Sequence, residues 1–115
     1  GDDCMELVED LVSRADELFS LGETENEIEK LVSKFRDGIV NLLKALLAYH
    51  QQDVDESFSQ LVKACLNVEP DLVEIEMELQ MFAPGIELAG VDKEELIDSA
   101  NEIWDWVIDV LDQTE

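Results

Sequence analysis

Apolar residues recur along four segments of the chain at spacings that alternate between four and three positions. A mean period of about 3.5 residues is typical of helices that lie side by side with their apolar faces turned inward. The pattern therefore predicts an all-α fold with one shared core. The four stripes extend from Cys4 to Leu18, from Ile28 to Tyr49, from Val54 to Phe82 and from Leu96 to Val110.

Turn-forming and capping residues give the expected limits of the first two helices. The first helix is expected over residues 3–21, followed by Gly22 as a left-handed C-terminal cap. Thr24 and Glu27 form a capping-box pattern that would begin the second helix, which should reach Tyr49. Gly38 lies inside this helix, where we expect it to permit the close approach of a neighbouring helix.

The third apolar segment contains a proline, which complicates its interpretation. Asp53 and Glu56 form a second capping-box pattern at its start, and Pro84 marks its end. Pro70 interrupts the backbone hydrogen bonds of a helix but is well tolerated in the first turn of a new one. The apolar stripe keeps its phase through Pro70, so the segment is either one kinked helix or two helices that meet there.

The last helix is expected to begin after a third capping box and to end at about residue 111. Asp92 is its expected cap, with Glu95 as the reciprocal residue. Residues 83–91 form the loop before it. Three apolar side chains of this loop are expected to pack against the end of the bundle: Ile86, Leu88 and Val91.

The length of 115 residues suits a single domain, spanning residues 1–115. Because the connections are short, neighbouring helices should be antiparallel. The sequence thus predicts an antiparallel up-and-down four-helix bundle, with five helices if Pro70 breaks the third. Gly1 in place of an initiator Met suggests a tag remnant or a domain excised from a longer chain.

The chain is strongly acidic, with a formal net charge of −23 from 30 acidic and 7 basic residues. Such a surface repels nucleic acids and anionic lipids, so we expect no direct nucleic-acid or membrane partner, and a charged partner should be basic. The 46% of hydrophobic residues argues against a disordered acidic tail. Halophilic adaptation is an alternative explanation, although Lys outnumbers Arg and large apolar residues are abundant.

The cysteines and the hydropathy pattern bear on the cellular compartment. Cys4 and Cys65 both fall on apolar stripes, where a free thiol acts as a small hydrophobic group. The sequence has no signal-peptide pattern and no apolar run long enough to span a bilayer. We therefore expect a cytoplasmic protein in a reducing environment.

No motif for catalysis, metal binding or cofactor binding is found. Di-iron bundles use Glu-x-x-His pairs, but the single histidine, His50, has Leu47 at the required position. Calcium loops need acidic residues at alternate positions around a Gly, and Asp53 and Asp55 have no such Gly after them. We expect His50 to be a solvated turn residue, and we expect no enzyme activity, metal or cofactor.

One segment departs from the pattern of a simple bundle because it has two apolar faces. Val73, Met77 and Met81 lie opposite the core stripe of the third segment. A helix that is apolar on both sides is either central in its domain or covered by something else. The cover could be the loop 83–91 or a partner protein, for which the adaptable Met side chain is well suited.

Two tryptophans flank the apolar stripe of the last helix on opposite sides. Trp104 and Trp106 are difficult to bury together in a narrow bundle. Since Trp is enriched at binding hot spots, one of them is a candidate for partner contact. Trp104 is the better candidate for packing at the core edge, which leaves Trp106 for the partner.

These observations favour a non-enzymatic protein–protein interaction module. Its partner would be basic or amphipathic, as in chaperone-like binding, or a second copy of the chain in a homodimer. The expected contact residues are Val73, Met77, Met81 and Trp106. The alternative is an acidic nucleic-acid mimic that sequesters DNA- or RNA-binding proteins; its binding should depend on salt and not on Met77 or Met81.

Overall fold

The computed structural model describes residues 2–52, 57–87 and 90–112, with side chains from residue 6 onward. The described residues form an all-α bundle of five α-helices and one 3-10 helix, as the hydrophobic period predicts. The elements are α1 (Asp2–Glu23), α2 (Ile28–Tyr49), α3 (Phe58–Val68), η1 (Pro70–Ile75), α4 (Glu76–Gln80) and α5 (Lys93–Asp112).

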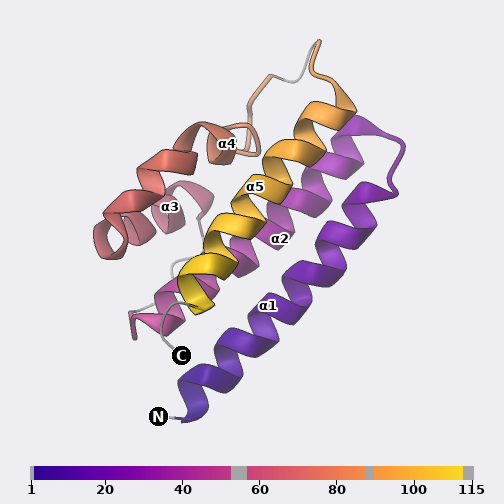
Figure 1. Cartoon of the computed structure of the whole chain (residues 1–115). Coiled ribbons are helices and arrows are strands. Elements are labelled where there is room, and N and C mark those ends of the chain that lie inside the picture. Colours follow the sequence, from indigo (N-terminus) through magenta and orange to yellow (C-terminus); the bar gives the residue numbers. More distant parts are fainter. Residues whose placement is uncertain (1, 53–56, 88–89, 113–115) are drawn as a thin grey trace.

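Three long helices and one shorter helical pair make up the bundle. Figure 1 shows α1, α2 and α5 as long rods side by side, with α3 and α4 packed on one flank. α2 contacts α1, α3 and α5, and α4 contacts α5. The resulting shape is elongated, with extents of 44 × 24 × 23 Å.

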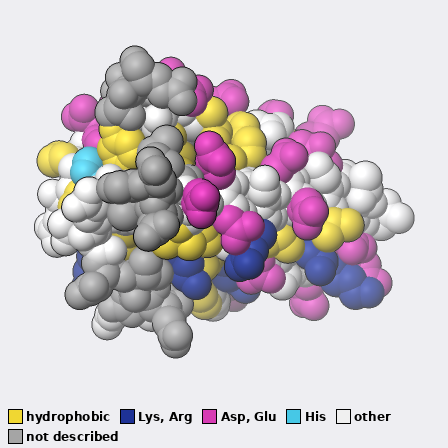
Figure 2. Space-filling view, turned by 90° about the horizontal axis from the view of Figure 1, so that it is seen from below, with side chains coloured by type: hydrophobic (Ala, Val, Ile, Leu, Met, Phe, Trp, Pro, Cys, Tyr) yellow, Lys and Arg dark blue, Asp and Glu magenta, His cyan; other side chains and the backbone are white. Residues whose placement is uncertain are grey.

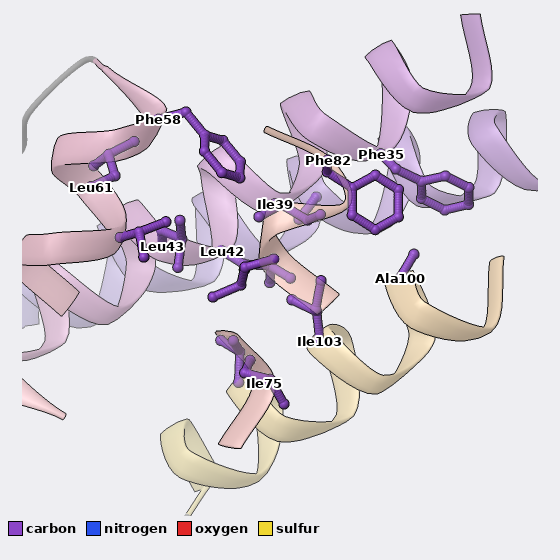
Figure 3. Close-up of a cluster of buried hydrophobic side chains, with 14 of the residues drawn as sticks. Phe35, Ile39, Leu42, Leu43, Phe58, Leu61, Ile75, Phe82, Ala100 and Ile103 are labelled. Atoms are coloured by element: carbon purple, nitrogen blue, oxygen red, sulfur yellow. The ribbon is translucent and has the colours of Figure 1, made fainter. Parts of the chain in front are cut away.

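The core is centred on α2, which is buried on most of its circumference. Eleven of its residues are buried, more than in any other described helix. In Figure 3 the rings of Phe35 and Phe82 lie beside each other, and Ile39 and Leu42 face side chains of α3 and α5. A helix with this much apolar surface must be enclosed by its neighbours, and α2 is therefore the central helix of the fold.

Pro70 divides the third predicted helix, which confirms the five-helix alternative. α3 ends at Val68, and Glu69 adopts an extended backbone with φ −133° and ψ 82°. Pro70 then occupies the first turn of η1, where its missing N–H is not needed. α3 contacts η1, and side chains of α3 and α4, such as Val62 and Gln80, line a common groove.

The contacts of α3 with α2 show that these two helices run in the same general sense. The Cys65 thiol lies 3.3 Å from the carbonyl oxygen of Leu43, and Glu69 pairs with His50 just beyond the end of α2. α2 and α3 are therefore not antiparallel, although short loops predicted that neighbouring helices would be. The eight residues 50–57 can span roughly 26 Å, which is long enough to return the chain along α2.

The connection between α1 and α2 differs from the predicted capping box. The Thr24 hydroxyl donates to the carbonyl oxygen of Leu21 at 3.1 Å, so it serves the end of α1 instead of the start of α2. Glu27 is the N-cap of α2 and makes no side-chain capping bond. The prediction was wrong here because α1 continues to Glu23, two residues beyond its expected end.

The two glycines of the α1–α2 contact allow the helices to approach closely. A Cβ on Gly38 would lie 2.5 Å from the Phe19 ring, which confirms the expected role of Gly38. Gly22 lies within α1 and not in a left-handed cap, and a Cβ there would lie 3.0 Å from the Phe35 ring. Both positions therefore leave room for a phenylalanine of the other helix.

The starts of α3 and α5 settle the remaining predicted boundaries. α3 begins at Phe58, with Ser57 as N-cap accepting a hydrogen bond from the Gln60 N–H at 3.2 Å. This start is four residues later than expected, and the predicted cap residues Asp53 and Glu56 lie outside the described residues. α5 begins at Lys93, next to the expected cap Asp92.

Candidate functional site

The two apolar faces predicted for the segment after Pro70 are present in the structure. Leu72 and Leu79 are buried in the main core, together with Ile75 and Phe82. On the opposite side, Val73 is 60% exposed and Met77 is 82% exposed, the largest exposed fraction among the described large apolar residues. A methionine this exposed contributes little to the core, so its face of the helix is available for contact.

A groove of about 400 Å³ lies between this face and the loop that follows α4. Met77 and Met81 form one wall, and Ile86 and Val91 lie on the loop side. The described residues of the loop therefore border this face and leave Met77 82% exposed, and Ile86 itself stays 42% exposed. We call this site the methionine groove, lined by Glu76, Met77, Gln80, Met81, Ile86, Glu87 and Val91.

The turn after α4 is what places the loop wall of the methionine groove. The backbone N–H of Ala83 donates to the Gln80 carbonyl oxygen at 3.2 Å, and that of Ile86 donates to the Ala83 carbonyl oxygen at 3.3 Å. Gly85 has a φ of +83°, a value that favours glycine. This turn directs Ile86 beside Met77; the predicted position of Leu88 lies outside the described residues.

The two methionines of the groove have different surroundings. The Met81 side chain is half-buried against the main core, and its Sδ accepts a hydrogen bond from the Ser99 hydroxyl of α5 at 3.2 Å. Met77 points outward one helical turn earlier. Met81 therefore helps to attach α4 to α5, whereas Met77 offers free apolar surface.

The charge around the methionine groove has one sign. Glu76 and Glu87 line it, and none of the described lining residues is basic. Between residues 64 and 92 the sequence contains seven acidic residues and no Lys, Arg or His. Elsewhere, Figure 2 shows acidic side chains scattered over one face of the molecule, with the few basic ones gathered along one side. The groove therefore presents apolar surface within a negative potential.

A second groove, which the sequence did not indicate, lies on the other side of α4. It has a volume of about 720 Å³ and shares Glu76 and Gln80 with the methionine groove. Buried Phe58 and Val62 of α3 contribute apolar surface, and Lys63 adds a positive charge. Its mixed charge makes it less selective for a basic partner than the methionine groove.

The predicted contact residues are only partly brought together. Met77 and Met81 line the methionine groove, whereas Val73 lies one turn before Met77 and is not among the lining residues. Trp106 is half-buried against the main core and does not line the groove either. Trp104 packs near Phe19, with ring centroids 5.4 Å apart. Both tryptophans thus have contacts within the bundle.

His50 and Cys65, the other potentially reactive side chains considered, both make contacts within the fold. His50 is not a solvated turn residue as expected, because its Nε2 lies 3.0 Å from a Glu69 carboxylate oxygen and both side chains are about three-quarters buried. Cys65 is fully buried, and desolvation raises the pKa of its thiol to about 12. Such a thiol is a poor nucleophile. Within the described ranges, no group of three or more His, Cys, Asp or Glu residues could hold a metal ion.

Comparisons with other proteins add no assignment to these observations. Known family models, characterised proteins and solved structures were compared with the chain, and none of them matches it. Among the described helices, none has the length and apolar character needed to cross a membrane.

Proposed function

We propose that the protein is a non-enzymatic interaction module whose methionine groove binds a basic amphipathic helix of another protein. The observation that carries this proposal is the 82% exposure of Met77 beside an apolar groove bordered by Glu76 and Glu87. An amphipathic helix would place apolar side chains in the groove and Lys or Arg side chains near the glutamates. This arrangement would be chaperone-like, since it shields an apolar helix face of the partner.

Charge complementarity supports a basic partner over a second copy of the chain. Two copies would each carry a net charge of −23, and the segment from 64 to 92 has no basic residue to offset the repulsion. A basic helix would instead be attracted, which raises the association rate and makes it sensitive to salt. We propose that this binding occurs in the cytoplasm, an environment that suits the free, buried Cys65.

The binding test uses a fluorescent peptide of about 18 Leu and Lys residues arranged as an amphipathic helix, a length of five turns. Fluorescence anisotropy would compare the wild type with Met77→Asp. We expect the substitution to weaken binding roughly tenfold or more, because it removes the burial of one large apolar side chain. The added carboxylate should by itself attract a basic peptide, so a loss of affinity would identify apolar docking.

The matched control is Leu7→Asp, the same kind of change at a 47% exposed position on α1. It should leave peptide affinity unchanged, and circular dichroism should show both variants to be as helical as the wild type. Met81→Asp is less suitable, because Met81 packs against the core and contacts Ser99. Equal affinity of Met77→Asp and Leu7→Asp would contradict the assignment of the groove.

The nucleic-acid mimic remains the second candidate, supported by the 30 acidic residues and their spread over the face in Figure 2. A second peptide in which every Leu is replaced by Ser separates the two functions. Apolar docking predicts that this peptide binds much more weakly than the Leu/Lys peptide. A mimic predicts equal binding of both peptides, released by salt and unaffected by Met77→Asp. Sedimentation of the free protein would show any self-association.

A further inference from the structure

The sulfur atoms of Met77 and Met81 differ in how accessible they are to an oxidant. Met77 is 82% exposed, so its thioether is accessible to small solutes in water. Met81 is half-buried against the core, and its sulfur already accepts the Ser99 hydroxyl at 3.2 Å. An oxidant reacts with a sulfur lone pair, and the hydrogen bond and the burial both make that lone pair less available on Met81.

We propose that Met77 is a methionine-oxidation site, and that its sulfoxide prevents the partner helix from docking. Hydrogen peroxide would transfer one oxygen atom to the Met77 sulfur as its O–O bond breaks. The sulfur loses two electrons, the peroxide gains them, and water leaves, so that the thioether becomes a sulfoxide. The docking effect rests on the proposed function, whereas the preference for Met77 over Met81 does not.

Oxidation of Met77 would make one wall of the methionine groove polar, which disfavours the docking of an apolar partner surface. Oxidation turns a flexible apolar side chain into a polar one. In the free protein the polar group would stay hydrated, because Met77 is exposed, and folding should be unaffected. In the complex the same group would be buried beside Ile86 without a partner, which disfavours binding. Oxidation would therefore act on association and not on stability.

The site preference is measured by treating the whole protein with limiting hydrogen peroxide and mapping the products by tandem mass spectrometry. Fragment ions that end at Glu78 separate Met77 from Met81 in the sequence. We expect Met77 to oxidise several-fold faster than Met81. Ser99→Ala removes the hydrogen bond to Met81 and should raise the oxidation rate of Met81 while leaving that of Met77 unchanged. Equal rates for Met77 and Met81 in the wild type would overturn the inference.

The docking effect is measured with the Leu/Lys peptide before and after oxidation. Oxidised wild type should bind roughly tenfold more weakly. Met77→Leu should bind normally and keep its affinity after peroxide, whereas Met81→Leu should stay sensitive. Unchanged affinity of protein shown to be oxidised at Met77 would overturn the inference although the proposed function holds. Failure of unoxidised protein to bind the peptide would instead overturn the proposed function, and the docking effect with it.

Discussion

The Arg36 side chain on α2 donates a hydrogen bond from Nε to the backbone carbonyl oxygen of Phe82, 2.7 Å away. The bond joins positions 46 residues apart and holds the chain just beyond α4, where the loop wall of the methionine groove begins. The carbonyl oxygens at the end of a helix lack partners within the helix. A charged donor from the central helix therefore fixes the end of the groove segment to the core.

We predict that Arg36→Met destabilises the protein by about 1–2 kcal/mol, since it removes a hydrogen bond with a charged donor. The measurement is urea unfolding followed by circular dichroism. Arg14→Met is the control because it removes the same charge from an exposed i,i+4 pair with Asp10 and should cost no more than about 0.5 kcal/mol. Equal destabilisation by the two substitutions would show that net charge, and not the Phe82 contact, matters.

We predict that Gly38→Ala destabilises the protein although Ala favours helix formation. The new Cβ would lie 2.5 Å from the Phe19 ring, which is itself held between Phe35 and Trp104. Overpacking of this kind costs about 1–3 kcal/mol, against a gain of roughly 1 kcal/mol in helix propensity. Thermal unfolding should rank Gly38→Ala below Gly22→Ala, whose Cβ meets the Phe35 ring at 3.0 Å.

The Gly38 result can be tied to the Phe19 ring by a double-mutant cycle. Phe19→Leu removes the edge of the ring that the new Cβ would meet, so the cost of Gly38→Ala should be smaller in that background. Additive free energies of unfolding for the two substitutions would contradict the steric explanation.

The buried Cys65 thiol should make stability fall with rising pH in alkaline solution. Burial raises the pKa of Cys65 from 9.0 to about 12. Between these values the unfolded thiol ionises while the folded thiol stays protonated, so unfolding is favoured. The contribution is a loss of up to about 1.4 kcal/mol per pH unit above pH 9, with no effect below it. Urea unfolding of a Cys4→Ser background from pH 8 to pH 10.5 measures this dependence.

The matched variant for this measurement is Cys65→Ala in the same background. It should be less stable at pH 8, since it leaves a small cavity, but its stability should vary less between pH 9 and pH 10.5. A parallel pH dependence in both proteins would assign the effect to other groups. A thiol reagent should also label Cys65 only as fast as the protein unfolds.

The sequence indicated the candidate site only in part. The two-faced pattern around Met77 was visible because helical periodicity is a local property, and the exposure of Met77 agrees with it. Val91 packs against the main core, as expected, and also lines the groove, whereas Ile86 was expected to pack against the bundle end and is instead 42% exposed at the groove. Pro84-Gly85 marked a turn in the sequence, but the direction of a turn depends on what it packs against. Trp106 was selected because it flanks the apolar stripe of its helix, but it is half-buried against the main core and does not line the groove.

By itself the sequence determined the all-α fold, the C-terminal end of α2, both limits of α5 to within about one residue, and the close approach at Gly38. These features follow from apolar spacing and residue size, which act locally. The nearly continuous apolar run from Leu42 to Ala48 could also have identified α2 as the central helix.

Only the tertiary structure decided how the chain after α2 folds back along the bundle and which hydrogen-bond partners the polar groups of the connections have. Pro70 allowed a kink or a break, and the break with α3 beside α2 depends on contacts between residues far apart, such as Cys65 with Leu43. Thr24 was expected to cap the start of α2, but α1 continues to Glu23 and the Thr24 hydroxyl donates to the Leu21 carbonyl oxygen of α1 instead. Local preferences restrict each segment to a few conformations, and the choice among them is made by burial of the shared core.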